Sequence, residues 1–183
     1  MPLRSDPTGY GTLARGLHWV TALIVAGLWI VGTVMVDLTD LGLKFSLYQW
    51  HKSFGFVVLG LTALRLVWRH LDRRPPPLPM PAWQRRASAV SHALLYVLLI
   101  VIPVSGFLMV STAPIAIPTV LFGVLPVPHP LGPDEPLFAL FRQIHESLTT
   151  LLLVLVALHV AAALKHHLVD RDAVLRRMLV QRP

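Results

Sequence analysis

Four long apolar segments occupy most of this 183-residue chain and constrain its fold more than any other feature. They span residues 17–36, 51–68, 92–110 and 145–164, and each is close to the roughly 20 residues that a helix needs to cross a bilayer. The chain is 55% hydrophobic and only 14% charged, and no segment shows the alternating polarity of a membrane barrel. We therefore predict an all-α, transmembrane four-helix bundle that forms a single integral-membrane domain over residues 1–183.

The basic residues are distributed unevenly between the polar segments. Thirteen of the 16 lysines and arginines lie in the amino-terminal tail, the second connection and the carboxy-terminal segment. The first and third connections hold only Lys44, Lys52 and Arg142. The positive-inside rule then places both termini and the second connection in the cytoplasm, as expected for a multi-pass membrane protein. The net charge of +7 is explained by basic residues on the cytoplasmic side of a membrane protein. We therefore predict that the chain is surrounded by membrane lipid and does not bind nucleic acid.

Two connections are rich in proline. The second connection holds five prolines within residues 75–81, which predicts a stiff, non-helical spacer and a third helix that starts around residues 88–91. The third connection, residues 111–141, holds seven prolines and several large apolar residues. We expect an irregular cap on the outer surface there, with a short helix near residues 120–124.

His145 and His159 lie fourteen residues apart in the last apolar segment. On a helix this interval places both imidazoles on one face, separated by ~21 Å along the axis. Ionisable residues inside a membrane are costly and usually functional, so the spacing suggests one ligand for each of two cofactors. Haem fits best, because its flat macrocycle packs between helices and its iron accepts imidazole from both sides. The chain has no cysteine, which excludes covalently attached haem and iron–sulfur clusters.

The expected depths of the histidines select the opposite ligands. His18 begins the first span on the inner side, where His159 also lies, and His51 begins the second span on the outer side, with His145. The bundle is therefore predicted to enclose two non-covalent haem b groups with bis-His ligation. His92 also lies at an inner helix start, and it is an alternative to His18 as the partner of His159.

Other residues are suited to a haem site with lower specificity. Lys52 and Arg142 lie beside the two outer ligands and are candidates for contact with haem propionates or for steering a small anion. Gly55, one turn after His51, has no side chain and would allow close approach of a macrocycle. The same residues also suit the ordinary roles of marking the lipid boundary and packing helices.

The pattern resembles the bacterial cytochrome b561 family, in its compact four-helix, di-haem branch. The matching motifs occur in order on all four predicted helices: Arg15–Trp19, His51–Gly55, Leu64–Leu66, Pro103–Gly106, His145–Glu146 and Leu158–His159. The resemblance implies ligation by His18, His51, His145 and His159. It also implies an oxidoreductase that moves electrons between an outer-face donor such as superoxide and ubiquinone.

Two other functions use the same histidines. Haem-bearing membrane anchor subunits of larger dehydrogenases or hydrogenases share bis-His four-helix cores, and such a protein would have a redox partner subunit. A metal or proton transporter would instead show no haem absorption, and it leaves the pairing at two depths unexplained.

Overall fold

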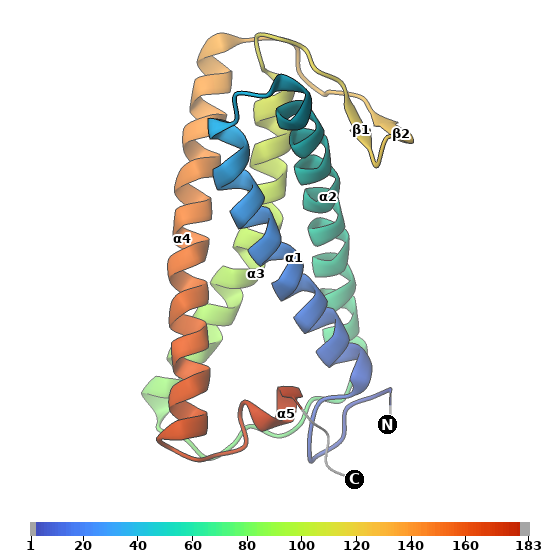
Figure 1. Ribbon diagram of the computed structural model, residues 1–183. Helices are drawn as coiled ribbons and strands as arrows, with labels where there is room; N and C mark the ends of the chain where they lie inside the picture. Colours follow the sequence, from blue (N-terminus) through green and yellow to red (C-terminus); the bar gives the residue numbers. More distant parts are fainter. Residues whose placement is uncertain (1–2, 180–183) are drawn as a thin grey trace. The chain divides into compact units, whose positions relative to one another are not determined.

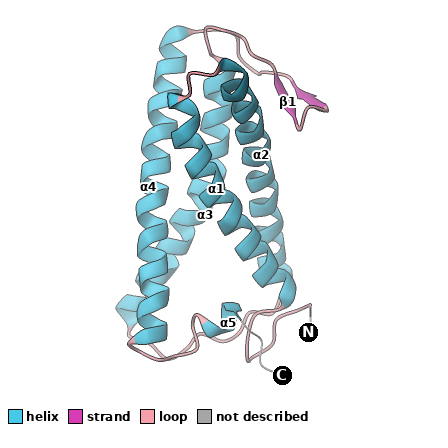
Figure 2. Ribbon diagram, in the orientation of Figure 1, coloured by secondary structure: helices cyan, strands magenta, loops and turns pink. Residues whose placement is uncertain are grey.

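The computed structural model describes residues 3–179, and these are mostly helical (Figure 1, Figure 2). The long helices are α1 (Thr12–Asp37), α2 (Leu41–Leu71), α3 (Ala82–Ser111) and α4 (Glu135–Leu168). By length and composition, all four are able to cross a membrane. The predicted all-α fold class with four membrane-spanning helices is therefore confirmed.

Each long helix extends beyond the apolar segment that predicted it. Helix α3 begins at Ala82, directly after Pro81, and not around residues 88–91. The extra residues are mainly alanine, glutamine and arginine, which favour a helix without being apolar. Hydropathy marks the part of a helix that suits lipid, so it misses such polar ends. As expected, residues 75–80 are not helical.

The third connection contains a β-hairpin in place of the expected short helix. Strand β1 (Thr119–Leu121) pairs antiparallel with β2 (Leu125–Val127) (Figure 2). In the turn, Phe122 and Gly123 have φ angles of 52° and 72°. Such left-handed conformations suit the turn of a tight hairpin and are incompatible with a right-handed helix, so the prediction of a helix near residues 120–124 was wrong.

Large apolar side chains are exposed along the long helices. Leu23 on α1, Val67 on α2 and Leu158 on α4 are 72%, 55% and 60% exposed. Such extensive apolar exposure is unfavourable in water and is expected where helices face lipid. The exposure pattern agrees with a membrane protein.

The chain divides into two compact units, each built from segments of the long helices. The terminal unit comprises residues 1–21, 61–97 and 152–183, and the hairpin unit comprises residues 22–60 and 98–151. All four histidines predicted as ligands belong to these units in pairs: His18 and His159 to the first, His51 and His145 to the second. The expectation of a single domain over the whole chain stays a prediction.

In the terminal unit the two ends of the chain contact each other. A short helix that we did not expect, α5 (Arg176–Leu179), follows α4. The indole of Trp19 on α1 donates to the carbonyl of Met178, at 2.9 Å. Arg177 donates to the carbonyl of Pro76, at 2.8 Å, which links α5 to the proline-rich connection. These contacts bring together three segments that the charge pattern assigned to one side of the membrane.

Candidate functional site

The hairpin unit brings His51 on α2 next to His145 on α4. Their ring centroids lie 6.5 Å apart, at an interplanar angle of 72°. A metal–imidazole bond of about 2 Å on each side of one iron sets two ring centroids about 6 Å apart. The separation of this pair therefore fits a bis-imidazole iron, as the depth argument predicted.

His145 is oriented by helix α3. Its Nδ1 lies 3.0 Å from the carbonyl oxygen of Ile102 and 3.2 Å from the hydroxyl of Ser105. A carbonyl oxygen only accepts, so Nδ1 carries the proton and donates it to Ile102. Metal-bound histidines are commonly held in this way, with one ring N–H on a carbonyl and the other nitrogen free to ligate. The hydrogen bond to Ile102 therefore leaves the lone pair of Nε2 of His145 free to bind a metal.

Two glycines lie directly against the imidazoles of His51 and His145. A Cβ at Gly106 would stand 2.9 Å from Cε1 of His145, and a Cβ at Gly32 would stand 3.2 Å from Cε1 of His51. Carbon atoms normally approach to about 3.5–4.0 Å, so a side chain at Gly106 would displace the ring of His145, and one at Gly32 would require a smaller shift of the ring of His51. The two glycines therefore leave space that the rings of His145 and His51 occupy.

His51 also offers an unused ring nitrogen. Its Nδ1 is buried and has no hydrogen-bond partner among the described residues. Buried polar atoms are rarely left unpaired in proteins, and each exception calls for an explanation, such as a bound ion or a catalytic role. A buried imidazole nitrogen without a protein partner is consistent with a residue that binds a cofactor.

The terminal unit brings three histidines together. The ring of His159 on α4 lies 6.3 Å from the ring of His18 on α1 and 5.4 Å from the ring of His92 on α3, between centroids. The first distance fits a bis-imidazole iron, and the second is shorter than that geometry requires. His92 also lies 3.3 Å, through Nδ1, from the hydroxyl of Ser88. The geometry thus favours His18 over His92 as the partner of His159.

The two basic residues predicted beside the outer ligands have different surroundings. The ammonium of Lys52 donates to the carbonyl of Pro118 at 3.1 Å, a carbonyl that also accepts from Gln49 at 2.8 Å. Arg142 forms a salt bridge with Glu146 at 2.8 Å, and both side chains are more than half exposed. The charge of Arg142 is therefore compensated locally, whereas Lys52 contacts only a carbonyl dipole among the contacts that the structure describes.

His129 lies in the third connection, after β2. Its Nε2 lies 3.0 Å from the hydroxyl of Thr119, and its ring packs edge-on against Phe107. Burial and the nearby ammonium of Lys52 lower the pKa of His129 below its ordinary value. The lowered pKa favours the neutral form of His129, so the shift opposes a second positive charge beside Lys52.

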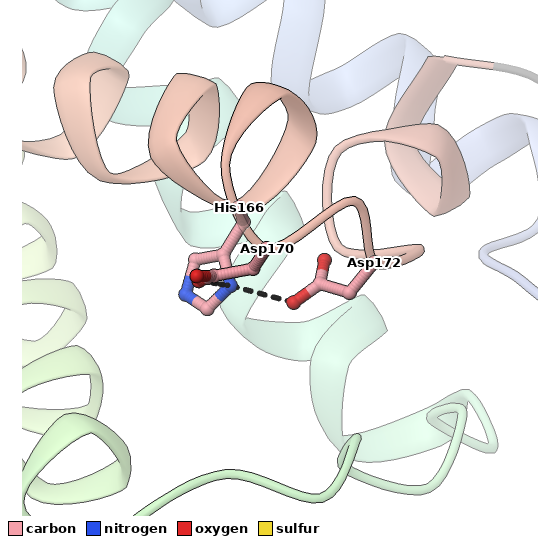
Figure 3. Close-up of side chains that lie close together, drawn as sticks. All are labelled: His166, Asp170 and Asp172. Carbon is pink, nitrogen blue, oxygen red and sulfur yellow. Dashed lines mark hydrogen bonds and ion pairs between the residues drawn. The ribbon is translucent and has the colours of Figure 1, made fainter.

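A further group of ligand-type side chains lies at the end of α4 (Figure 3). Nδ1 of His166 lies 2.6 Å from a carboxylate oxygen of Asp172 and 3.2 Å from one of Asp170. Asp170 also accepts from the ammonium of Lys165. These side chains are partners for one another, and they tie the end of α4 to the turn that precedes α5.

Several residues of the two sites were not selected from the sequence. Gly32 and Gly106 lie against ligand rings, and Ser105 contacts His145, whereas a Cβ at Gly55, which the sequence singled out, would meet no atom within 4 Å. Small residues are common in membrane helices for many reasons, so their type alone does not identify them. Gly106 lies in a motif, Pro103–Gly106, that the sequence resemblance had already marked.

Comparison with known proteins decides the family. The sequence profile of prokaryotic cytochrome b561 matches residues 9–180, which is nearly the whole chain. This chain belongs to the prokaryotic cytochrome b561 family. Family membership makes it a membrane electron-transfer protein that binds b-type haem. The resemblance suggested by the ordered histidine motifs is thereby confirmed.

Individual relatives of the cytochrome b561 family align over most of their length. Cytochrome b561 homolog 2 of Escherichia coli is 34% identical over 183 residues, covering 98% of this chain and 95% of the relative. Cytochrome b561 homolog 1 of the same organism is 30% identical over 172 residues, with 91% and 94% covered. The probable superoxide oxidase CybB of Yersinia pestis is 27% identical over 175 residues, with 93% and 95% covered.

Proposed function

We propose that this chain is a di-haem membrane cytochrome b that carries electrons from superoxide at the outer face to ubiquinone. One observation carries the proposal: each unit holds a pair of histidines whose ring centroids are 6.3 Å or 6.5 Å apart. His18 and His159 would hold one haem b, and His51 and His145 the other, without covalent attachment. Haem supplies one-electron redox chemistry when it is bound, and the protein supplies its position and surroundings.

The proposed donor is supported by one relative and by chemistry. The Yersinia pestis relative is named a probable superoxide oxidase. Oxidation of superoxide to dioxygen releases one electron, so two superoxide ions and two protons convert one ubiquinone to ubiquinol and two dioxygen molecules. A membrane protein with one-electron cofactors suits this stoichiometry, because it accepts electrons singly and delivers two in succession.

The proposed orientation places the protein in the bacterial inner membrane with both termini in the cytoplasm. The excess of lysine and arginine in the terminal segments and the second connection supports it. The contacts of α5 with Trp19 and with Pro76 support it as well, because all three segments are then on one side. His51 and His145 would be the ligands nearer the superoxide source.

Lys52 is the better candidate of the two predicted outer cations for attracting an anion or pairing with a propionate. It follows the ligand His51 directly, and among the described residues it forms no salt bridge. Arg142 is paired with Glu146, so an approaching anion meets little net charge there.

Superoxide-dependent ubiquinol formation by the purified protein in liposomes tests the proposal. We expect Lys52→Met to slow the second-order reaction with superoxide several-fold at low ionic strength, and less at high salt, because steering is screened. Arg142→Met is the matched control and should have a smaller effect, and haem content is measured for both variants.

Three outcomes count against parts of this proposal. Absence of superoxide-dependent ubiquinol formation by a fully haem-loaded protein would remove superoxide as the donor. Activity that appears only with a co-purified dehydrogenase or hydrogenase subunit would favour the anchor-subunit alternative. Equal salt dependence in wild type and Lys52→Met would remove the steering role of Lys52.

A further inference from the structure

Arg65 on α2 is a half-buried cation at the histidine cluster of the terminal unit. Its Nη2 lies 3.2 Å from Nδ1 of His18. Its guanidinium also lies over the ring of Tyr96, 5.4 Å from the centroid, and Arg69 lies over the same ring at 5.7 Å. Two guanidinium groups thus converge on one tyrosine beside the proposed ligands His18 and His159.

No carboxylate balances these two cations in the part of the chain that the structure describes. The ion pairs there involve other residues, and neither Arg65 nor Arg69 takes part in one. Asp72, Asp170 and Asp172 of the same unit accept hydrogen bonds from other side chains. A partly desolvated cation without a counter-charge is unfavourable, so the arrangement calls for an anionic group from outside the chain.

The hydrogen bond between Arg65 and His18 conflicts with ligation by His18. A guanidinium only donates, so Nδ1 of His18 accepts with its lone pair, and the proton of the neutral imidazole is on Nε2. A ligating histidine needs a free lone pair on one nitrogen and a proton on the other. Ligation through Nε2 moves the proton to Nδ1, and ligation through Nδ1 uses the accepting lone pair. In either case Arg65 has to leave His18.

We propose that Arg65 is a carboxylate-binding residue of this haem site, which exchanges its hydrogen bond to His18 for one to a haem propionate when the cofactor binds. Arg69 supplies a second cation for the second propionate. Haem b carries two carboxylates, and arginine binds carboxylate with two parallel N–H groups, which makes it a better partner than an imidazole nitrogen. The proposal rests on the proposed ligation by His18 and His159.

Redox-difference infrared spectra of the haem-loaded protein, with haem labelled by ¹³C at the propionate carboxyls, test this exchange. In wild type we expect isotope-sensitive carboxylate bands, and these bands should shift in Arg65→Met. They should shift less in Arg65→Lys, because lysine keeps the positive charge but lacks the two parallel N–H donors of the guanidinium. The matched control, Arg86→Met, changes an exposed arginine of the same unit and should leave the bands unchanged. Transfer of haem to excess apomyoglobin should be about ten- to a hundredfold faster from one site in Arg65→Met.

The result that would overturn the exchange is an Arg65→Met protein whose labelled bands and haem release match those of wild type. If Arg65→Met does not accumulate, the labelled carboxylate bands of Arg65→Lys are compared with those of wild type. Identical bands in these two proteins would also overturn the exchange. Failure of the underlying ligation is distinguishable, because it would appear as full haem retention in a His18→Ala protein whatever residue stands at position 65.

Discussion

Replacing His18 with alanine is expected to reduce the purified protein from two b haems per chain towards one. The ring of His18 lies 6.3 Å from that of His159, the separation that two imidazoles on one iron require, so its removal leaves this haem with a single protein ligand. The low-spin signal of that haem in electron paramagnetic resonance should disappear, and the second low-spin signal should persist. Haem content is measured by pyridine haemochrome absorption against protein concentration.

His92→Ala is the matched control for this change. His92 also contacts His159, but its ring is only 5.4 Å away, which is too close for an iron between them. The variant should keep both haems and both low-spin signals. The opposite pattern, with haem lost from His92→Ala and retained in His18→Ala, would make His92 the ligand and would contradict the proposed site.

Gly106→Ala is expected to weaken haem binding at the other site while the helices persist. The new Cβ would stand 2.9 Å from Cε1 and 3.1 Å from Nδ1 of His145, so the ring has to move. Movement also disturbs the hydrogen bond from His145 to Ile102, which fixes the ligand nitrogen. Overpacking of this kind costs about 1–3 kcal/mol, equivalent to roughly a five- to 150-fold loss of haem affinity. Low-spin signals and haem content report the loss.

A graded series separates this effect from helix propensity. Gly32→Ala places a Cβ 3.2 Å from Cε1 of His51 and should reduce haem content less than Gly106→Ala. Gly60→Ala on α2 has no atom within 4 Å of the new Cβ and should retain both haems. All three changes favour a helix by about 1 kcal/mol, so helix propensity alone predicts no loss in any of them. Equal haem content across the series would show that the glycines do not position the rings.

The sequence was sufficient to predict the helices and the pairs of histidines. Apolar segments of membrane-spanning length predicted the four long helices, because a segment inside a bilayer has to satisfy its backbone hydrogen bonds internally. The pairing of His18 with His159 and of His51 with His145 followed from helix direction and depth, and the structure brings each pair together within one unit. That these pairs hold haem stays a proposal.

What the sequence did not reveal depends on particular contacts between helices. The carbonyl of Ile102 that orients His145 is a backbone group, present at every residue, so nothing in the sequence distinguishes it. In the sequence, Arg65 was only one of the basic residues assigned to the inner side and a member of one family motif. Its contact with His18 joins residues on two different helices, so the sequence did not predict it. The β-hairpin was missed because the apolar run around residues 120–124 also suits an interfacial helix, although a glycine in a short turn was a usable signal.

The most direct test of the central claim is the haem-to-protein ratio of the purified wild-type chain, measured by pyridine haemochrome absorption and quantitative amino-acid analysis. Two pairs of imidazoles, each at the separation of a bis-imidazole iron, predict two haem b groups per chain, both low-spin. A ratio of one haem per chain in a fully loaded preparation, or a high-spin signal from either haem, would contradict the account.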